Sequence, residues 1–402
     1  MKIKLTPSRA IGTVKAPPSK SMAHRLLICA GLSPGESTVC NVEPSEDVLA
    51  TMDCLRAMGC RVQYKGDAVT VVGVDARTAA IGSILPCREC GSTLRFFVPI
   101  ALLCGREVTL TGSRKLLSRP LGVYREMCKE KGYFYAATEE LVMVKGPLVS
   151  GVYEVAGDVS SQFISGLLFA LPLLEENSKI CITGNVESRS YIDLTIAALE
   201  EFGVLVDWED DQTLSIPGGQ QYRSHDTEVE GDYSNAAFFS ALDWMGGDVR
   251  VEGLSPDSLQ GDRVYPSYFE EITKGTPTLD VTDCPDLAPV LMAMAAAHRG
   301  AILTGTARLR LKESDRGAAM AQELTKMGGD VLVEEDRITI NLHRLYAPST
   351  PLCGHNDHRI VMALSVLLSY YGGEINGAEA VAKSLPDFFD RLKRLGVKVE
   401  TV

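Results

Sequence analysis

The chain has 402 residues, 45% of them hydrophobic and 23% charged, which is enough for two or more domains with cores of their own. Its formal net charge of -12 argues against nucleic acid or an anionic membrane as a partner, because such partners select basic proteins. The first residues lack an apolar signal core, and eleven cysteines are scattered without a secretory pattern. We therefore expect a cytoplasmic protein with free thiols and no membrane contact.

Along the chain, six apolar helices rich in small residues are each preceded by a polar head. The heads are Lys20-Ser21, Gly91-Ser92-Thr93, Ser160-Ser161-Gln162, Asp232, Asp286 and residues 356–359. A helix N-terminus offers free N–H groups and the positive end of a dipole, so it favours anions. Their repetition predicts a protein that holds a small polyanionic ligand.

A second pattern repeats with the first: an amphipathic helix, a glycine and a β-branched strand. Four clear copies and two looser ones lie at 55–62, 198–206, 324–331, 392–399, 124–135 and 268–275. The glycine suits the left-handed position that ends a helix. Together the patterns predict six α/β units about seventy residues apart, the fourth one shortened. Solenoid repeats usually span about 20 to 50 residues, so larger α/β units are favoured.

Six such units predict two lobes, each with three units around a pseudo-threefold axis. The polar stretch 217–231 is the natural crossing point between the third and fourth units. The strand-like first residues could belong with either lobe. A ligand is expected in a cleft between two lobes.

The segment that follows Pro17-Pro18 starts a helix with Lys20, Ser21 and Arg25 close together. A phosphate or carboxylate there would meet an ammonium, a hydroxyl and the helix dipole at once. An ordinary capped helix with exposed basic residues is the alternative. Ser188-Arg189 and Ser118-Arg119 precede second helices, where each arginine could equally be a solvated loop charge.

The densest run of charges is 308–316. Arg308, Arg310 and Lys312 alternate, which predicts three cations on one face of a strand. Like charges on one face are unfavourable unless an anion neutralises them. Ser314 or Asp315 then caps the next helix. Glu313 among these cations is an acid–base candidate only if burial offsets its lowered pKa, and a surface salt-bridge network is the alternative.

No metal and no organic cofactor is predicted. His358 has no second ligand at metal-binding spacing, since His355 lies three residues away in a loop. Cys87 and Cys90 form a single CxxC with no second pair, and the anion loop that follows explains the segment better than a redox role. The sequence contains neither a Walker A loop nor a convincing dinucleotide fingerprint.

These motifs, in this order, resemble the enolpyruvyl transferase family, and within it the 5-enolpyruvylshikimate-3-phosphate (EPSP) synthases. The matching segments are PPSKSMAHR, GSTLR, SRPLG, DVSSQF, SRSYIDL, EGDYSNA, DCPDLAP, RLKESDR, NDHR and AKSLPDFF. The resemblance implies a two-lobed, inside-out α/β barrel with three α/β units in each lobe. Lobe I would comprise 1–14 and 229–402, and lobe II 15–228, so that the chain crosses twice, with the substrates in a cleft that closes on them.

The implied reaction transfers the enolpyruvyl group of phosphoenolpyruvate to the 5-hydroxyl of shikimate 3-phosphate. It proceeds through a tetrahedral intermediate, releases phosphate and belongs to the shikimate pathway, which leads to chorismate and the aromatic amino acids. The resemblance requires no cofactor, and the two small molecules are the expected partners of a monomer.

The resemblance also assigns site residues. Those that match the shikimate 3-phosphate site are Lys20, Ser21, Arg25, Ser160, Ser161, Gln162, Ser188, Tyr191, Asp286 and Lys312. Those that match the phosphoenolpyruvate site are Lys20, Gly91, Arg119, Gln162, Arg316, Arg359 and Lys383, with Arg95 and His358 in support. For catalysis, Glu313 or Lys20 would protonate the methylene carbon, and Asp286 would orient or deprotonate the 5-hydroxyl.

Three positions depart from the family pattern. Glu89 and Cys90 stand where many members carry Asn and a small residue, and Arg308 stands where others have Asn. Gly91 is kept, so the resemblance implies that glyphosate, a competitor of phosphoenolpyruvate, binds here.

Two other functions compete with this reading. A UDP-N-acetylglucosamine enolpyruvyl transferase would carry Lys-Asn at Lys20-Ser21 and a reactive cysteine within 112–119, and this chain has neither. A non-catalytic anion-binding scaffold would not need both Asp286 and Glu313.

Overall fold

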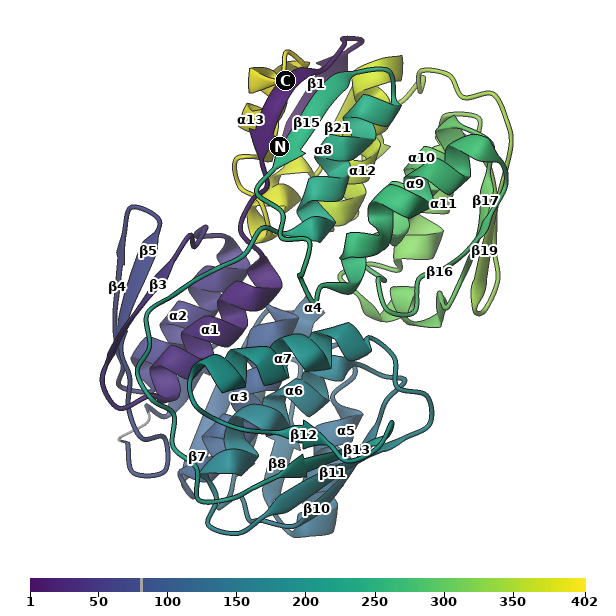
Figure 1. Cartoon of the computed structure of the whole chain (residues 1–402). Helices are drawn as coiled ribbons and strands as arrows, with labels where there is room; N and C mark the ends of the chain where they lie inside the picture. The colour runs from purple at the N-terminus through teal and green to yellow at the C-terminus, as the bar shows by residue number, and fades with distance from the viewer. Residues whose placement is uncertain (80–81) are drawn as a thin grey trace. The chain divides into compact units, whose positions relative to one another are not determined.

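The computed structural model describes residues 1–79 and 82–402, which divide into two compact units (Figure 1). Unit 1 comprises Met1–Pro17 and Gly231–Val402, and unit 2 comprises Pro18–Glu230. Each unit has a hydrophobic core of its own. No helix in the described ranges combines the length and the apolar character that crossing a membrane requires.

Unit 2 contains the first three repeats. The first is β14 (Thr227–Glu228), α1 (Lys20–Leu32), β3 (Glu36–Cys40), α2 (Glu46–Ala57), β4 (Arg61–Lys65) and β5 (Ala68–Val72). The second is β6 (Ile84–Pro86), α3 (Gly91–Leu103), β7 (Glu107–Thr111), α4 (Arg114–Leu117), α5 (Gly122–Lys131), β8 (Phe134–Ala137) and β9 (Leu141–Lys145). The third is β10 (Val152–Ala156), α6 (Ser161–Ala170), η1 (Leu171–Leu173), β11 (Ser178–Thr183), α7 (Arg189–Glu201), β12 (Asp207–Trp208) and β13 (Thr213–Ile216).

Unit 1 contains the other three repeats. The fourth is β2 (Ile11–Lys15), α8 (Tyr233–Trp244), β15 (Asp248–Glu252), η2 (Gly261–Val264) and α9 (Tyr265–Lys274). The fifth is β16 (Thr278–Asp280), α10 (Ala288–Ala297), β17 (Ala301–Thr304), η3 (Ala307–Leu311), α11 (Arg316–Lys326), β18 (Asp330–Val333) and β19 (Arg337–Asn341). The sixth is β20 (Leu352–Cys353), α12 (His358–Tyr371), β21 (Gly373–Asn376), η4 (Ala378–Lys383), α13 (Phe388–Arg394), β22 (Lys398–Thr401) and β1 (Lys2–Thr6).

Five of the six repeats build the same four-stranded sheet. A parallel pair such as β10 and β11 is extended by two antiparallel strands, in the order β10-β11-β13-β12. In the described residues, the fourth repeat has only the parallel pair β15 and β2. The predicted architecture of repeated α/β units is confirmed, including the shortened fourth unit.

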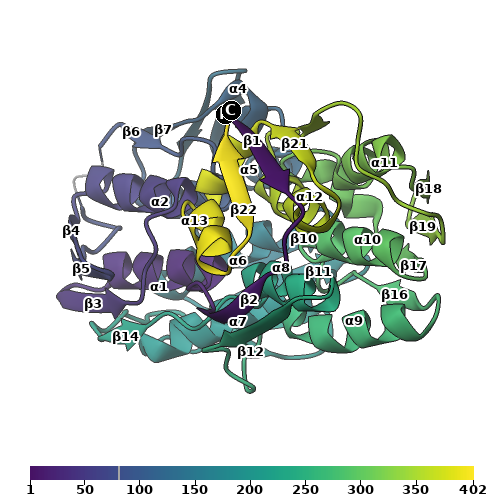
Figure 2. The same cartoon turned by 90° about the horizontal axis from the view of Figure 1, so that it is seen from above.

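Two strands exchange places between repeats. β2 leads into α1 but pairs with β15 of the fourth repeat, whereas β14 leads into α8 but pairs with β3 of the first. The chain therefore passes from one unit to the other twice, next to Pro17 and Glu230. β1 lies between β21 and β22, antiparallel to both, and so completes the sixth sheet from the other end of the chain (Figure 2).

The polar-headed helices are the buried helices of their repeats. In unit 1, α10 packs against α8 and α12, and nearly all of its sequence APVLMAMAAA is buried. The second helices bury one face only: α9 buries Tyr265, Phe269 and Ile272, spaced one turn apart. Small apolar side chains let helices pack closely on every side, which explains why the first helices are rich in them.

The glycine that ends the second helix behaves as predicted in five repeats. Gly59, Gly132, Gly203, Gly328 and Gly396 have φ values between +74° and +96°, which an L side chain rarely adopts. The sixth prediction was wrong: Gly275 has φ -172°, so the chain leaves α9 in an extended conformation.

Candidate active site

In unit 1, one buried arginine contacts three carboxylates. Arg316 is the first residue of α11, and its side chain is 2% exposed. Nε donates to Asp357 Oδ2 at 2.9 Å, Nη1 to Asp286 Oδ1 at 2.7 Å, and Nη2 to Glu313 Oε2 at 2.8 Å. The planar guanidinium therefore sets the positions of three acidic groups relative to one another.

Asp286 receives two further cations. Arg359 Nη2 donates to Asp286 Oδ2 at 2.8 Å, and Lys312 Nζ lies 3.5 Å from Asp286 Oδ1. Burial favours the neutral acid, but the charges of Arg359, Lys312 and Arg316 outweigh it and hold the pKa of Asp286 well below its usual range. Asp286 is therefore an ionised carboxylate at neutral pH.

The cations of this group respond in opposite ways. Burial would lower the pKa of Arg316, but Asp357, Glu313 and Asp286 raise it well above its usual value. The pKa of Lys312 is lowered, by burial first and then by neighbouring Arg316, although Asp286 opposes the shift. We call the group Asp286, Lys312, Glu313, Arg316, Asp357 and Arg359 the carboxylate cluster.

Helix α12 contributes its N-terminus to the carboxylate cluster. Asp357 is the N-cap: its Oδ1 accepts from Arg359 N at 2.9 Å, and its Oδ2 accepts from Ser314 Oγ at 3.1 Å. Lys383, at the end of η4, donates to Asn356 O at 2.7 Å. His358 is buried, with Nδ1 3.9 Å from Asp357 Oδ1. The structure thus gathers the seven predicted unit 1 residues Asp286, Lys312, Glu313, Arg316, His358, Arg359 and Lys383 around α10, α11 and α12.

The predicted strand through 308–312 was wrong. Residues 307–311 form the 3₁₀ helix η3, in which residues three apart share a face, so alternate cations point in different directions. Arg308 is buried and donates to Thr282 O at 3.0 Å. Arg310 is exposed and donates to Glu335 O and Ala307 O. Asp315, rather than Ser314, caps α11.

In unit 2, the starts of α3 and α6 meet through side chains. Gln162 Nε2 donates to Ser92 Oγ at 2.9 Å, and its Oε1 accepts from Arg95 Nη1 at 2.6 Å. A Cβ at Gly91 would come within 2.9 Å of Arg119 Nη1 and 3.1 Å of Arg95 Nη1, so glycine leaves room for both guanidinium groups. We call Lys20, Gly91, Arg95, Arg119 and Gln162 the helix-start cluster.

Arg25 joins the starts of α1 and α7. Nε donates to Thr195 Oγ1 at 2.8 Å, Nη1 to Ser21 O at 2.7 Å and Nη2 to Tyr191 O at 2.8 Å. Burial is the main cause that lowers the pKa of Arg25 to about 10. Arg25 holds the backbone at Ser21 and Tyr191, and Ser188 precedes α7 in the left-handed conformation, with φ 56°.

The two serines at the start of α6 differ in role. Ser160 Oγ accepts from Gln162 N at 3.3 Å, which is ordinary N-capping. Ser161 is the first residue of the helix and is 6% exposed. Capping of α6 therefore explains why a serine stands at position 160.

Lys20 pairs with a carboxylate that the sequence did not single out. Its Nζ lies 2.7 Å from Asp47 Oδ2, and the two side chains are 14% and 11% exposed. Asp47 lies in the first turn of α2 after the N-cap Ser45, where an acidic residue is common, so nothing in the sequence marked it.

Asp262 was also missed. It is 3% exposed, and Ser234 Oγ donates to its carboxyl group. Burial and the charge of Asp286 raise the pKa of Asp262 to about 7, although Arg359 opposes them. The only signal was an acidic residue in the loop-like segment that precedes α9.

Solved structures define the class of protein to which this fold belongs. An EPSP synthase from Acinetobacter baumannii superposes with a TM-score of 0.81 at 24% identity, covering 99% of each chain. The enolpyruvyl transferase NikO from Streptomyces tendae superposes with a TM-score of 0.77 at 12% identity, covering 99% of this chain and 98% of its own. The fold is therefore that of the enolpyruvyl transferases.

Sequence comparison identifies the family. The family model described as EPSP synthase (3-phosphoshikimate 1-carboxyvinyltransferase) matches residues 5–392. A 3-phosphoshikimate 1-carboxyvinyltransferase of Clostridium kluyveri is 40% identical over 99% of this chain and 98% of its own length. The chain belongs to the EPSP synthase family, as its sequence motifs predicted.

Proposed function

We propose how this chain carries out the reaction of its family, the transfer of the enolpyruvyl group of phosphoenolpyruvate to the 5-hydroxyl of shikimate 3-phosphate. The helix-start cluster of unit 2 supplies cations for the anionic groups and Lys20 as a candidate proton donor, and the carboxylate cluster of unit 1 supplies further cations and the carboxylates Asp286 and Glu313 for proton transfer. The observation that carries this proposal is Asp286, an ionised carboxylate that is 16% exposed and is held by three cations.

Charge explains the need for so many cations. The two substrates together carry two phosphates and two carboxylates, which repel one another unless cations separate them. In the proposal, Lys20, Arg119, Arg316, Arg359 and Lys383 hold phosphoenolpyruvate, with Gly91 and Gln162 shaping its pocket. Ser21, Arg25, Ser160, Ser161, Ser188, Tyr191 and Lys312 bind or support shikimate 3-phosphate.

The chemistry requires four proton movements. Protonation of the methylene carbon gives C2 cationic character, so that the 5-hydroxyl oxygen can add and lose its proton. The tetrahedral adduct then loses phosphate with the help of an acid, and its new methyl group gives up a proton to a base, which restores the double bond of the enolpyruvyl group. Asp286 accepts the hydroxyl proton or orients the hydroxyl. Bound anions lie close to the cations that now lower its pKa, so substrate binding makes Asp286 a stronger base.

Two groups remain candidates for protonating the methylene carbon. Lys20 brings an ammonium group, which is protonated at neutral pH. Glu313 must first gain a proton. Its ion pair with Arg316 Nη2 at 2.8 Å disfavours the neutral acid until a bound substrate anion competes for that arginine. Substitution of each residue is therefore needed to distinguish Lys20 from Glu313.

One assay tests the reaction itself. Phosphate release from phosphoenolpyruvate is followed with shikimate 3-phosphate, with UDP-N-acetylglucosamine and with neither acceptor. Release only with shikimate 3-phosphate is expected. Release with UDP-N-acetylglucosamine and not with shikimate 3-phosphate would instead indicate a UDP-N-acetylglucosamine enolpyruvyl transferase. No release with either acceptor would favour a non-catalytic anion-binding protein.

Two substitutions test the catalytic roles. Lys20→Met and Glu313→Gln are each expected to lower kcat by at least about a hundredfold, since general acid–base groups contribute that much. Lys15→Met and Glu334→Gln, at exposed positions, are the matched controls and should keep the wild-type rate. Near-wild-type turnover in a folded Lys20→Met or Glu313→Gln protein would refute the role of that residue.

A further inference from the structure

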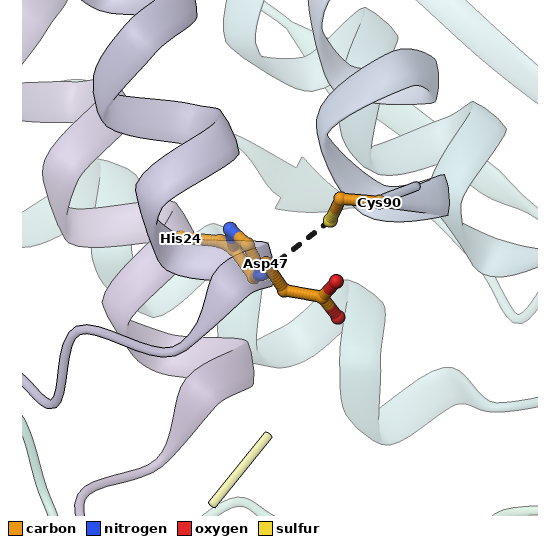
Figure 3. A group of neighbouring side chains, drawn as sticks. All are labelled: His24, Asp47 and Cys90. Carbon is orange, nitrogen blue, oxygen red and sulfur yellow. Dashed lines mark hydrogen bonds between the residues drawn. The ribbon is translucent and has the colours of Figure 1, made fainter. Parts of the chain in front are cut away.

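A buried group of metal-ligand type lies beside Lys20 in unit 2. His24 of α1, Asp47 of α2 and Cys90, the N-cap of α3, bring one ligand atom each to within 4.8 Å of the other two (Figure 3). Their exposed fractions are 1%, 8% and 2%. It is the one group of three His, Cys, Asp or Glu residues with this geometry in residues 1–79 and 82–402.

The imidazole of His24 is held from its far side. Nδ1 lies 2.7 Å from Thr51 Oγ1, which lies 2.7 Å from Thr93 Oγ1. With its proton on Nδ1, the ring donates to Thr51 and directs the Nε2 lone pair toward Cys90. Histidine ligands of metals are oriented in this way, by a hydrogen bond from the second ring nitrogen.

The spacing of the two softer donors matches a zinc site. With Zn–S about 2.3 Å and Zn–N about 2.1 Å, a tetrahedral ion separates the two donor atoms by about 3.6 Å. The observed separation of Cys90 Sγ and His24 Nε2 is 3.8 Å, and Figure 3 draws this contact. The backbone N–H of Thr93 points at the sulfur, 3.4 Å away, and would help to stabilise a thiolate.

The charge of the group also suits a divalent cation. Lys20 Nζ now balances Asp47, from 2.7 Å. A Zn²⁺ ion with one carboxylate, one thiolate and one neutral imidazole is electrically neutral without the lysine. Two cations competing for one carboxylate repel each other, so a metal there would push the ammonium group away.

We propose that His24, Asp47 and Cys90 form an inhibitory site for a thiophilic divalent cation such as Zn²⁺, which displaces Lys20 from Asp47. The metal forms bonds to His24 Nε2, an Asp47 oxygen and Cys90 Sγ, the thiol proton leaves to solvent, and a water fills the fourth position. The inhibitory effect, though not the binding, rests on the role proposed for Lys20. Hard cations such as Mg²⁺ prefer oxygen ligands and should not bind.

Cobalt(II) provides a binding readout that does not depend on activity. Titration of the full chain with Co²⁺ should produce one near-ultraviolet thiolate-to-cobalt charge-transfer band, removed by one equivalent of Zn²⁺. Cys90→Ser should abolish the band, and His24→Gln should weaken binding by about tenfold or more. Cys128→Ser, a buried cysteine of α5, is the control and should keep it. No band in the wild-type protein, or a band that persists in Cys90→Ser, would overturn the site.

Lys20→Met separates the site from the proposed function. Removing the competing ammonium group should tighten Zn²⁺ binding by roughly tenfold, about 1.4 kcal/mol, whatever turnover the variant retains. Weaker or unchanged binding would contradict displacement of Lys20.

Activity then completes the test. In the wild-type enzyme, Zn²⁺ but not Mg²⁺ should inhibit phosphate release, and Cys90→Ser should lose at least about tenfold in sensitivity relative to its own uninhibited rate. A wild-type enzyme that binds Co²⁺ through Cys90 yet keeps full activity with Zn²⁺ would leave the site standing and refute the role of Lys20. Equal inhibition of Cys90→Ser would overturn the inhibitory site.

Discussion

Arg316 in unit 1 and Arg25 in unit 2 are both buried near the start of a helix, and each donates three hydrogen bonds, yet their partners differ. Arg316 contacts three carboxylates, whereas Arg25 contacts a threonine hydroxyl and two backbone carbonyls. The pKa of Arg316 is raised and that of Arg25 is lowered. The charge of Arg316 is therefore neutralised by carboxylates, whereas the charge of Arg25 is solvated by neutral hydrogen-bond acceptors.

The same contrast holds for the two clusters. In the carboxylate cluster, Lys312, Arg316 and Arg359 face Asp286, Glu313 and Asp357, so the charges balance. In the helix-start cluster, Arg95 donates to an amide oxygen and a backbone carbonyl, and Lys20 pairs with Asp47. The carboxylate cluster therefore places three acidic groups against its cations, whereas neutral acceptors also hold a cation of the helix-start cluster.

Removing Arg316 should have the largest effect on stability. Arg316→Met leaves one buried and two partly buried carboxylates without their shared cation, and we expect a loss of about 3–5 kcal/mol in the free energy of unfolding. Denaturant unfolding measures it, with the exposed Arg310→Met as the control. The loss should shrink in acid, where the carboxylates become protonated. A loss independent of pH would contradict the charge argument.

Removing Arg25 should lower the free energy of unfolding by less than removing Arg316. Arg25→Met leaves a hydroxyl and two carbonyls with fewer donors but no buried charge, so we expect a loss of about 1–3 kcal/mol. Hydrogen exchange should show the weakening at the starts of α1 and α7. Because Arg25 donates to no carboxylate, the loss of stability in Arg25→Met should not diminish in acid. A loss that does diminish in acid would contradict the contrast with Arg316.

Asp262 should oppose stability as the pH rises. Its folded pKa of about 7 exceeds the unfolded value of about 3.9, so between these values the folded state retains a proton that the unfolded state loses. The contribution of Asp262 to the free energy of unfolding therefore falls as the pH rises from about 4 to about 7. Asp262→Asn should gain on the order of 1–2 kcal/mol relative to wild type between pH 5 and pH 8. Exposed Asp257→Asn is the control; a gain that is flat with pH would exclude the titration of Asp262.

Gly91→Ala should change binding more than folding. The added Cβ meets the ends of the flexible Arg119, Arg95 and Gln162 side chains, so stability should fall by no more than about 1 kcal/mol. Displaced guanidinium groups should raise KM for phosphoenolpyruvate by about tenfold, or about 1.4 kcal/mol. Glyphosate should compete with phosphoenolpyruvate in the wild type and bind less well to Gly91→Ala. Gly122→Ala, at the start of α5, is the control, and weak or purely noncompetitive inhibition of the wild type would count against the assignment.

Local sequence predicted what local chemistry controls. A polar head and a following apolar run were sufficient to locate the starts of α1, α3, α6, α8 and α12, and a glycine marked the end of most second helices. The strand through 308–312 failed because alternation of charge is only an indirect sign of a strand. Its residues instead follow β17 into a short 3₁₀ turn that Arg308 and Arg310 hold to neighbouring carbonyls.

The sequence by itself determined the repeated α/β units, their polar helix starts and, through its motifs, the family, because each depends on residues close together in the chain. Only the tertiary structure decided which strands exchange between repeats, that Arg316 gathers carboxylates from three segments, and that His24, Asp47 and Cys90 meet beside Lys20. Those contacts join residues as far apart in the chain as Ile11 and Asp248, and packing of the folded chain sets their distances.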